Sequence, residues 1–139
     1  MSNFFQFLNK QGDKYVLAVP MDPVKAQYPL FDTTEDMGKF VKAAITHYPS
    51  SEGQRILAAA DYYSATKIVE EFAEVTGQKA EVVRVPGDTF KSFLPAPVAD
   101  EMLENMLLLE DPGYYGGESL ASSLALVCLL YTSPSPRDS

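Results

Sequence analysis

Residues 54–85 read QRILAAADYYSATKIVEEFAEVTGQKAEVVRV, and this stretch decides the fold class. The apolar run 54–60 is typical of a strand covered on both faces, and 79–85 is typical of a second strand. Between them, Ser64 is a good N-cap and Gly77 suits the left-handed end of a helix. A strand, a helix and a strand with short connections predict a βαβ unit with parallel strands, and hence an α/β fold.

The sequence on either side of this unit predicts one more strand and further helices. Residues 14–20 (KYVLAVP) are typical of a short strand, and residues 88–93 and 98–109 favour helices. A helix is also predicted between Thr34 and Tyr48. Its apolar side chains recur at helical spacing and predict one buried stripe: Met37, Phe40, Val41, Ala44 and Ile45. About three strands are predicted, whereas open α/β sheets usually carry roughly 5–6, so we expect an incomplete sheet.

Composition places the chain among globular proteins and excludes several function classes. The chain has 139 residues, the size of one domain, with 46% hydrophobic and 22% charged residues. Its net charge of −8 argues against direct nucleic-acid binding and against an anionic membrane surface. A single cysteine allows no internal disulfide, and no apolar run reaches the roughly 20 residues of a membrane span. We therefore expect a cytoplasmic or nuclear protein.

Several strings of sequence together resemble the C-terminal half of NmrA-like proteins, which are atypical relatives of the short-chain dehydrogenases. They are residues 54–77, the FKSFLP of 90–95, the LLEDPGYYGG of 108–117 and the DTTEDMGKFV of 32–41. The likeness covers nearly all of residues 1–127. It implies the C-terminal portion of a Rossmann-like fold with its substrate-side subdomain, in a parent protein that binds NADP.

The dinucleotide fingerprint of that family lies near the N-terminus of the whole protein, and this chain contains neither G-x-x-G-x-x-G nor G-x-G-x-x-G. We therefore expect residues 1–127 to be the later part of an NmrA-like domain, with NADP bound by the full-length parent and not by this chain alone. Met1, Ser2 and Asn3 match the family segment that lines the nicotinamide end of the NADP groove. The resemblance makes them cofactor-binding candidates, although Asn3 can equally cap a helix containing Phe4 and Phe5.

The end of the chain differs in character from the rest. Residues 128–139 read CLLYTSPSPRDS and resemble, residue for residue, one reading frame of a transposase adapter used in preparing sequencing libraries. A natural Ser/Pro-rich terminus is the alternative interpretation. We expect an adapter-derived, disordered tail in which Cys128 has no role.

No catalytic or metal-binding residues are predicted. Tyr63 and Lys67 have the Tyr-x-x-x-Lys spacing of short-chain dehydrogenases, but a cap at Ser64 places Tyr63 outside the helix that the catalytic pair needs. His47 is the single histidine, so neither a zinc cluster nor a Ser-His-Asp triad can be assembled in this chain.

Three functions therefore remain open. The resemblance implies a non-catalytic, redox-sensing regulator that binds NADP and, in some members, transcription factors. The first alternative is an NAD(P)H-dependent reductase like the isoflavone-reductase relatives, with its catalytic lysine outside this chain. The second alternative is a stand-alone interaction module that pairs with another protein through the helix 98–109.

Overall fold

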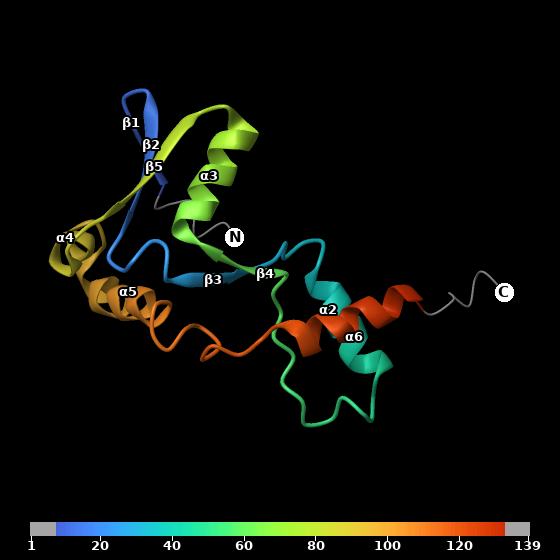
Figure 1. Cartoon of the computed structure of the whole chain (residues 1–139). Helices are drawn as coiled ribbons and strands as arrows, with labels where there is room; N and C mark the ends of the chain where they lie inside the picture. Colours follow the sequence, from blue (N-terminus) through green and yellow to red (C-terminus); the bar gives the residue numbers. More distant parts are fainter. Residues whose placement is uncertain (1–7, 133–139) are drawn as a thin grey trace. The chain divides into compact units, whose positions relative to one another are not determined.

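The computed structural model describes residues 8–132, and they form two compact units (Figure 1). Among these residues, the first unit comprises 8–28 and Tyr62–Gly117, and the second comprises Pro29–Asp61 and 118–132. The chain leaves the first unit along strand β3 (Gln27–Leu30) and returns along β4 (Asp61–Ser64). These two strands pair with one another in a two-stranded sheet.

The sheet of the first unit has three strands in the order β1–β2–β5. Strand β1 (Leu8–Gln11) and β2 (Lys14–Val19) form an antiparallel hairpin. Gly12 adopts φ +66° in the turn of this hairpin, a backbone conformation that glycine enters without steric cost. Strand β2 pairs in parallel with β5 (Lys79–Arg84), and Leu17 lies level with Val82. The mixed sheet with its parallel pair confirms the α/β prediction and fits part of a Rossmann-like fold.

Helix α3 (Ala65–Thr76) precedes β5 and has the ends that the sequence predicts. The Ser64 hydroxyl accepts a hydrogen bond from the Lys67 N–H at 3.2 Å, and Gly77 is left-handed with φ +67°. The helix contacts the sheet through an edge-to-face pair of Tyr15 and Phe72, whose ring centroids are 5.2 Å apart. Both helix-end predictions are therefore confirmed.

The predicted strand at residues 54–60 is wrong. Strand β4 begins at Asp61, and the parallel partner of β5 is β2. The backbone N–H groups of the apolar run do not donate to β5. The Leu57 N–H donates to the Ser123 hydroxyl at 2.9 Å, and the Ala60 N–H donates to the Leu30 carbonyl at 2.8 Å. Leu57 is nevertheless buried. An unalternated apolar run thus reports burial and does not by itself specify a strand.

Helices α4 (Gly87–Ser92) and α5 (Ala96–Leu108) confirm the two helices predicted after β5. They approach closely at Gly87, where a Cβ would lie 3.1 Å from Leu103 Cδ2. Helix α5 buries Met106, whose Sδ accepts a hydrogen bond from the Tyr28 hydroxyl at 3.7 Å. Burial raises the pKa of Tyr28 well above its ordinary value, so this phenol stays neutral.

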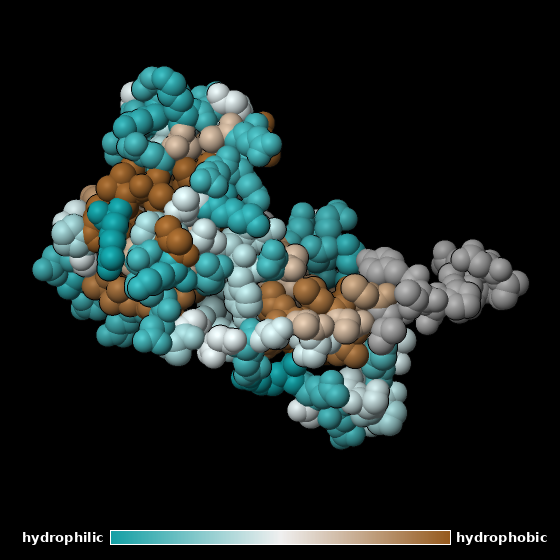
Figure 2. All heavy atoms as spheres, in the orientation of Figure 1, coloured by the Kyte–Doolittle hydropathy of each residue, from teal (hydrophilic) through white to brown (hydrophobic). Residues whose placement is uncertain are grey.

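The second unit contains helices α2 (Met37–Thr46) and α6 (Ala121–Thr132), which contact one another. Helix α2 confirms the predicted helix, but the prediction of a single buried stripe is wrong. Phe40 and Ala43 are buried and Ala44 is half-buried, whereas the other apolar side chains of this side are exposed: Met37, Val41, Ile45 and the following Tyr48. Figure 2 shows hydrophobic residues on the viewed surface along α6 as well.

Helix α6 ends at Thr132, so it continues past Cys128, where we expected a disordered tail to begin. The rest of that predicted tail, 133–139, lies outside the described residues.

Candidate functional site

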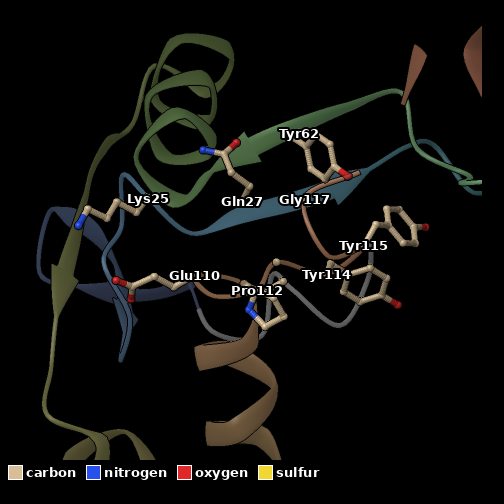
Figure 3. Close-up of a pocket in the computed structure, with 10 residues that line it drawn as sticks. Lys25, Gln27, Tyr62, Glu110, Pro112, Tyr114, Tyr115 and Gly117 are labelled. Carbon is tan, nitrogen blue, oxygen red and sulfur yellow. The ribbon is translucent and has the colours of Figure 1, made fainter. Parts of the chain in front are cut away.

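A pocket of about 310 Å³ lies entirely within the first unit (Figure 3). Its volume is at the lower end of the range typical of small-molecule sites. Figure 3 shows Lys25 and Glu110 toward one end of the pocket and three tyrosines toward the other. The lining residues are Lys25, Gln27, Tyr62, Leu109, Glu110, Pro112, Gly113, Tyr114, Tyr115 and Gly117.

The charged end is built on a tight turn after β2. The Asp22 carboxylate accepts hydrogen bonds from the N–H groups of Val24 at 2.9 Å and Lys25 at 3.1 Å. These two backbone bonds, with smaller contributions from nearby cations, hold the pKa of Asp22 below its ordinary value. The Pro23 carbonyl accepts from both the N–H and the hydroxyl of Thr66, so the turn is also fastened to helix α3.

The segment after α5 is fastened to the same turn. The Asp22 N–H donates to Glu110 Oε2 at 3.0 Å, and the Gln27 N–H donates to the Leu109 carbonyl at 3.2 Å. These bonds link positions more than 80 residues apart in sequence. The pocket therefore forms where a loop before β3 and the loop after α5 are held together.

The aromatic end carries two tyrosines in edge-to-face contact. The rings of Tyr114 and Tyr115 lie 4.9 Å apart with an interplanar angle of 85°. Burial raises the pKa of Tyr115, and the phenols of Tyr114 and Tyr62 raise it further, so Tyr115 is neutral at physiological pH. Gly113 has φ +95°, which lets the loop turn sharply before the tyrosine pair.

Sequence reasoning did not find this pocket. Residues 108–117 were noted only for their likeness to the family, and neither Lys25 nor Gln27 was predicted to be a binding residue. The available signal was the string Asp-Pro-Gly-Tyr-Tyr-Gly-Gly, since glycines around paired aromatics are typical of a shaped loop. The partners of that loop could not be read from the sequence.

Tyr63 and Lys67, which have the Tyr-x-x-x-Lys spacing, contact one another at the start of α3. Tyr63 belongs to β4 and lies outside helix α3, which Ser64 caps. The Lys67 ammonium lies 4.7 Å from the centroid of the Tyr63 ring, so it contacts the face of the ring. Tyr63 does not line the pocket.

Met1, Ser2 and Asn3, the cofactor-binding candidates, lie outside the described residues. His47 follows α2, and its Nδ1 lies 2.8 Å from the Ala43 carbonyl oxygen. Within residues 8–132 no group of three or more metal-ligating side chains is assembled.

The junctions from β4 to α3 and from β5 to α4 do not fit the pyrophosphate of a dinucleotide. At the start of α3 the Lys67 N–H already donates a hydrogen bond to the Ser64 hydroxyl. At the start of α4 the missing side chain of Gly87 makes room for Leu103, not for a phosphate, and this helix has six residues. Neither of these two junctions therefore provides the close backbone approach of a glycine fingerprint.

No helix within the described part of the chain combines the length and the apolar character that crossing a bilayer requires.

Comparison with known proteins places these features in a family. The sequence profile of the NmrA-like family matches residues 1–133. One curated relative, the "NmrA-like family domain-containing oxidoreductase malD" of Malbranchea aurantiaca, is 29% identical over 94 residues, which is 68% of this chain. The aligned region covers 26% of that relative, so the chain matches about a quarter of its length.

Proposed function

This chain belongs to the NmrA-like family, and on that premise we propose that it is the substrate-side part of an NADP-binding protein that senses the cofactor without turning it over. Members of this family generally bind NAD(P). The pocket in the first unit supplies the ligand-facing surface that such a part requires. The cofactor itself would be held by residues outside 8–132, because the described junctions do not fit its pyrophosphate.

The observation that carries the sensing role is the arrangement at the start of α3. A catalytic tyrosine needs a lysine that lowers the pKa of its hydroxyl and a position beside the nicotinamide. Here the Lys67 ammonium lies over the ring face of Tyr63, and Tyr63 precedes the Ser64 cap. The Tyr-x-x-x-Lys spacing in this chain therefore lacks the placement of a catalytic pair, which a sensor does not need and which a reductase would have to supply from residues outside 8–132.

A regulator acts by contacting a partner, and a transcription factor or another protein is the partner class that we propose. Helix α5 offers a surface for it, since Val98, Leu107 and Leu108 are exposed apolar side chains on that helix. We propose no direct contact with nucleic acid, in keeping with the net charge of −8.

The second candidate is an NAD(P)H-dependent reductase. It is favoured by the printed name of the curated relative, which calls that protein an oxidoreductase. In this case the proton donor would come from residues outside 8–132, and the tyrosine-lined pocket would hold the substrate.

The decisive experiment uses the longer protein, obtained by recovering the coding sequence upstream of Met1. Titration calorimetry with NADP and NADPH measures binding, and the absorbance of NADPH at 340 nm measures turnover with candidate carbonyl substrates. Binding without turnover is the result expected of a sensor. Turnover would establish the reductase, and failure to bind either nucleotide would refute both.

A further inference from the structure

We infer that the pocket of the first unit binds a planar aromatic ligand that is uncharged or positively charged, with its ring against the tyrosines. This inference deepens the proposed function, since the ligand would be the small molecule that the protein recognises beside NADP. Three features carry it: the arrangement of the aromatic rings, the balance of charge around the pocket, and the hydrogen bonds that fix the pocket in place.

The rings form an aromatic corner. Tyr114 and Tyr115 meet at 85°, and Tyr62 also lines the pocket, as Figure 3 shows. Two nearly perpendicular rings offer one face and one edge to a flat guest, the arrangement that aromatic pairs prefer. A volume of about 310 Å³ suits a guest of one or two rings and is small for a drug-sized ligand.

The charges around the pocket show no excess of positive charge that would hold an anion. Lys25 and Glu110 both line it and balance one another. Asp22, which accepts from the Lys25 N–H, adds a negative charge, and Arg84, whose positive charge helps to lower the pKa of Asp22, offsets it. The charged groups at this end of the pocket therefore balance one another, within a chain whose formal net charge is −8. The negative faces of the tyrosine rings favour a cation further.

The charged end is preformed. Hydrogen bonds join the turn at Asp22 to Glu110 and to helix α3, as described above. A carboxylate whose position is set by a backbone N–H loses little conformational entropy when a ligand arrives. Glu110 is therefore the fixed negative group that a cationic ligand would meet, and the tyrosines set the preference for a ring.

The test uses the full 139-residue chain and three probes that share a naphthalene ring: 2-naphthylmethylamine, 2-naphthol and 2-naphthoate. Dissociation constants are measured from ¹H–¹⁵N NMR titrations, following the amides of residues 109–117. We expect the amine to bind best and the naphthoate to bind at least about fivefold more weakly than the amine. Equal or tighter binding of naphthoate, or no shift of these amides with the amine and the naphthol, would overturn the inference.

Variants show whether the probes bind in this pocket, and they separate the contribution of the tyrosine rings from that of the Glu110 charge. Tyr114→Ala should weaken all three probes by about fivefold or more, whereas Tyr48→Ala, a tyrosine of similar exposure (68% against 57%) in the second unit, should leave binding unchanged. Glu110→Gln keeps an oxygen for the Asp22 N–H, so it should weaken only the amine, by about threefold to tenfold. Equal effects of Tyr114→Ala and Tyr48→Ala would overturn the assignment to this pocket.

The result is independent of the nucleotide. The probes are titrated without NADP, and NADP binding is measured separately on the longer protein. Loss of probe binding with NADP binding intact would refute this inference alone. Probe binding by a protein that takes up no NADP would refute the proposed function and leave this inference standing.

Discussion

The two units of this molecule bury their apolar residues in different ways. The first unit surrounds a three-stranded sheet, and Leu17 and Val19 of β2 are almost fully buried. The second unit has two helices and the irregular segment 47–60, and much of the apolar side of α2 is exposed. Apolar periodicity alone does not bury a side chain, because a neighbouring element must cover it.

The units also differ in how their loops are held. In the first unit, the turn at Asp22 is fixed by several backbone and side-chain bonds that reach α3 and the loop after α5. In the second unit, the apolar run before β4 is held at Leu57 by one hydrogen bond, which the Leu57 N–H donates to the Ser123 hydroxyl. We therefore expect the loss of one polar group to be tolerated better at the Asp22 turn of the first unit than at Leu57 of the second.

The largest expected effect is in the sheet of the first unit. Leu17→Ala removes a side chain that is 1% exposed and leaves a cavity in the core, which should cost about 2–5 kcal/mol of unfolding free energy. Ile45→Ala, at a position 71% exposed on α2, should change stability by no more than about 0.5 kcal/mol. Urea denaturation followed by circular dichroism measures both. Equal losses would contradict the difference in packing between the units.

The next effect concerns the Ser123 hydroxyl in the second unit. Ser123→Ala leaves the buried Leu57 N–H without its acceptor, which should cost about 1–3 kcal/mol. The neighbouring Ser122 is exposed, so Ser122→Ala is the matched control and should be nearly neutral. Hydrogen exchange at the Leu57 amide measures the local loss. Unchanged protection in Ser123→Ala would show that this bond does not hold the segment.

A smaller effect is expected at the N-cap of α3. Ser64→Ala removes the acceptor of the Lys67 N–H and should destabilise the first unit by about 1 kcal/mol. Ser64→Asp keeps a capping oxygen and places a negative charge at the positive end of the helix, so it should preserve stability. The melting temperature and the exchange rate of the Lys67 amide distinguish the two variants. A loss in Ser64→Asp equal to that in Ser64→Ala would argue against capping.

The smallest effect is a difference in salt dependence between two carboxylates. The pKa of Asp22 is lowered mainly by backbone N–H groups, whereas the pKa of Asp36 in the second unit is lowered mainly by the Lys39 ammonium at 2.7 Å. Because both pKa values lie below the ordinary 3.8, each carboxylate stabilises the fold above that pH and loses its contribution as the pH falls through its folded pKa.

Carboxyl-carbon NMR titrations at low and high salt measure both groups. Added salt should raise the pKa of Asp36 toward its ordinary value and leave that of Asp22 nearly unchanged, because ions screen an exposed ion pair more than a short bond to a backbone dipole. Equal sensitivity to salt would show that cations, not amides, lower the pKa of Asp22.

Local signals in the sequence predicted the helices well. Ser64 and Gly77 fixed the ends of α3, and the strand 14–20 was found because its β-rich run lies between turn residues. The sequence reading failed where a decision depended on distant residues: the strand expected at 54–60, and the parallel partner of β5. The pocket was missed for the same reason, since Lys25 and Glu110 are brought together by bonds across the chain.

By itself the sequence determined the α/β class, the family and the capped helix after β4, because caps, turns and apolar periods act over a few residues. Only the tertiary structure decided that β2 is the neighbour of β5, that the Leu57 N–H bonds to a serine, and that the tyrosines of the loop 109–117 line a pocket. These contacts join backbone donors and apolar faces that are far apart in the sequence, and no local sequence pattern specifies such pairs.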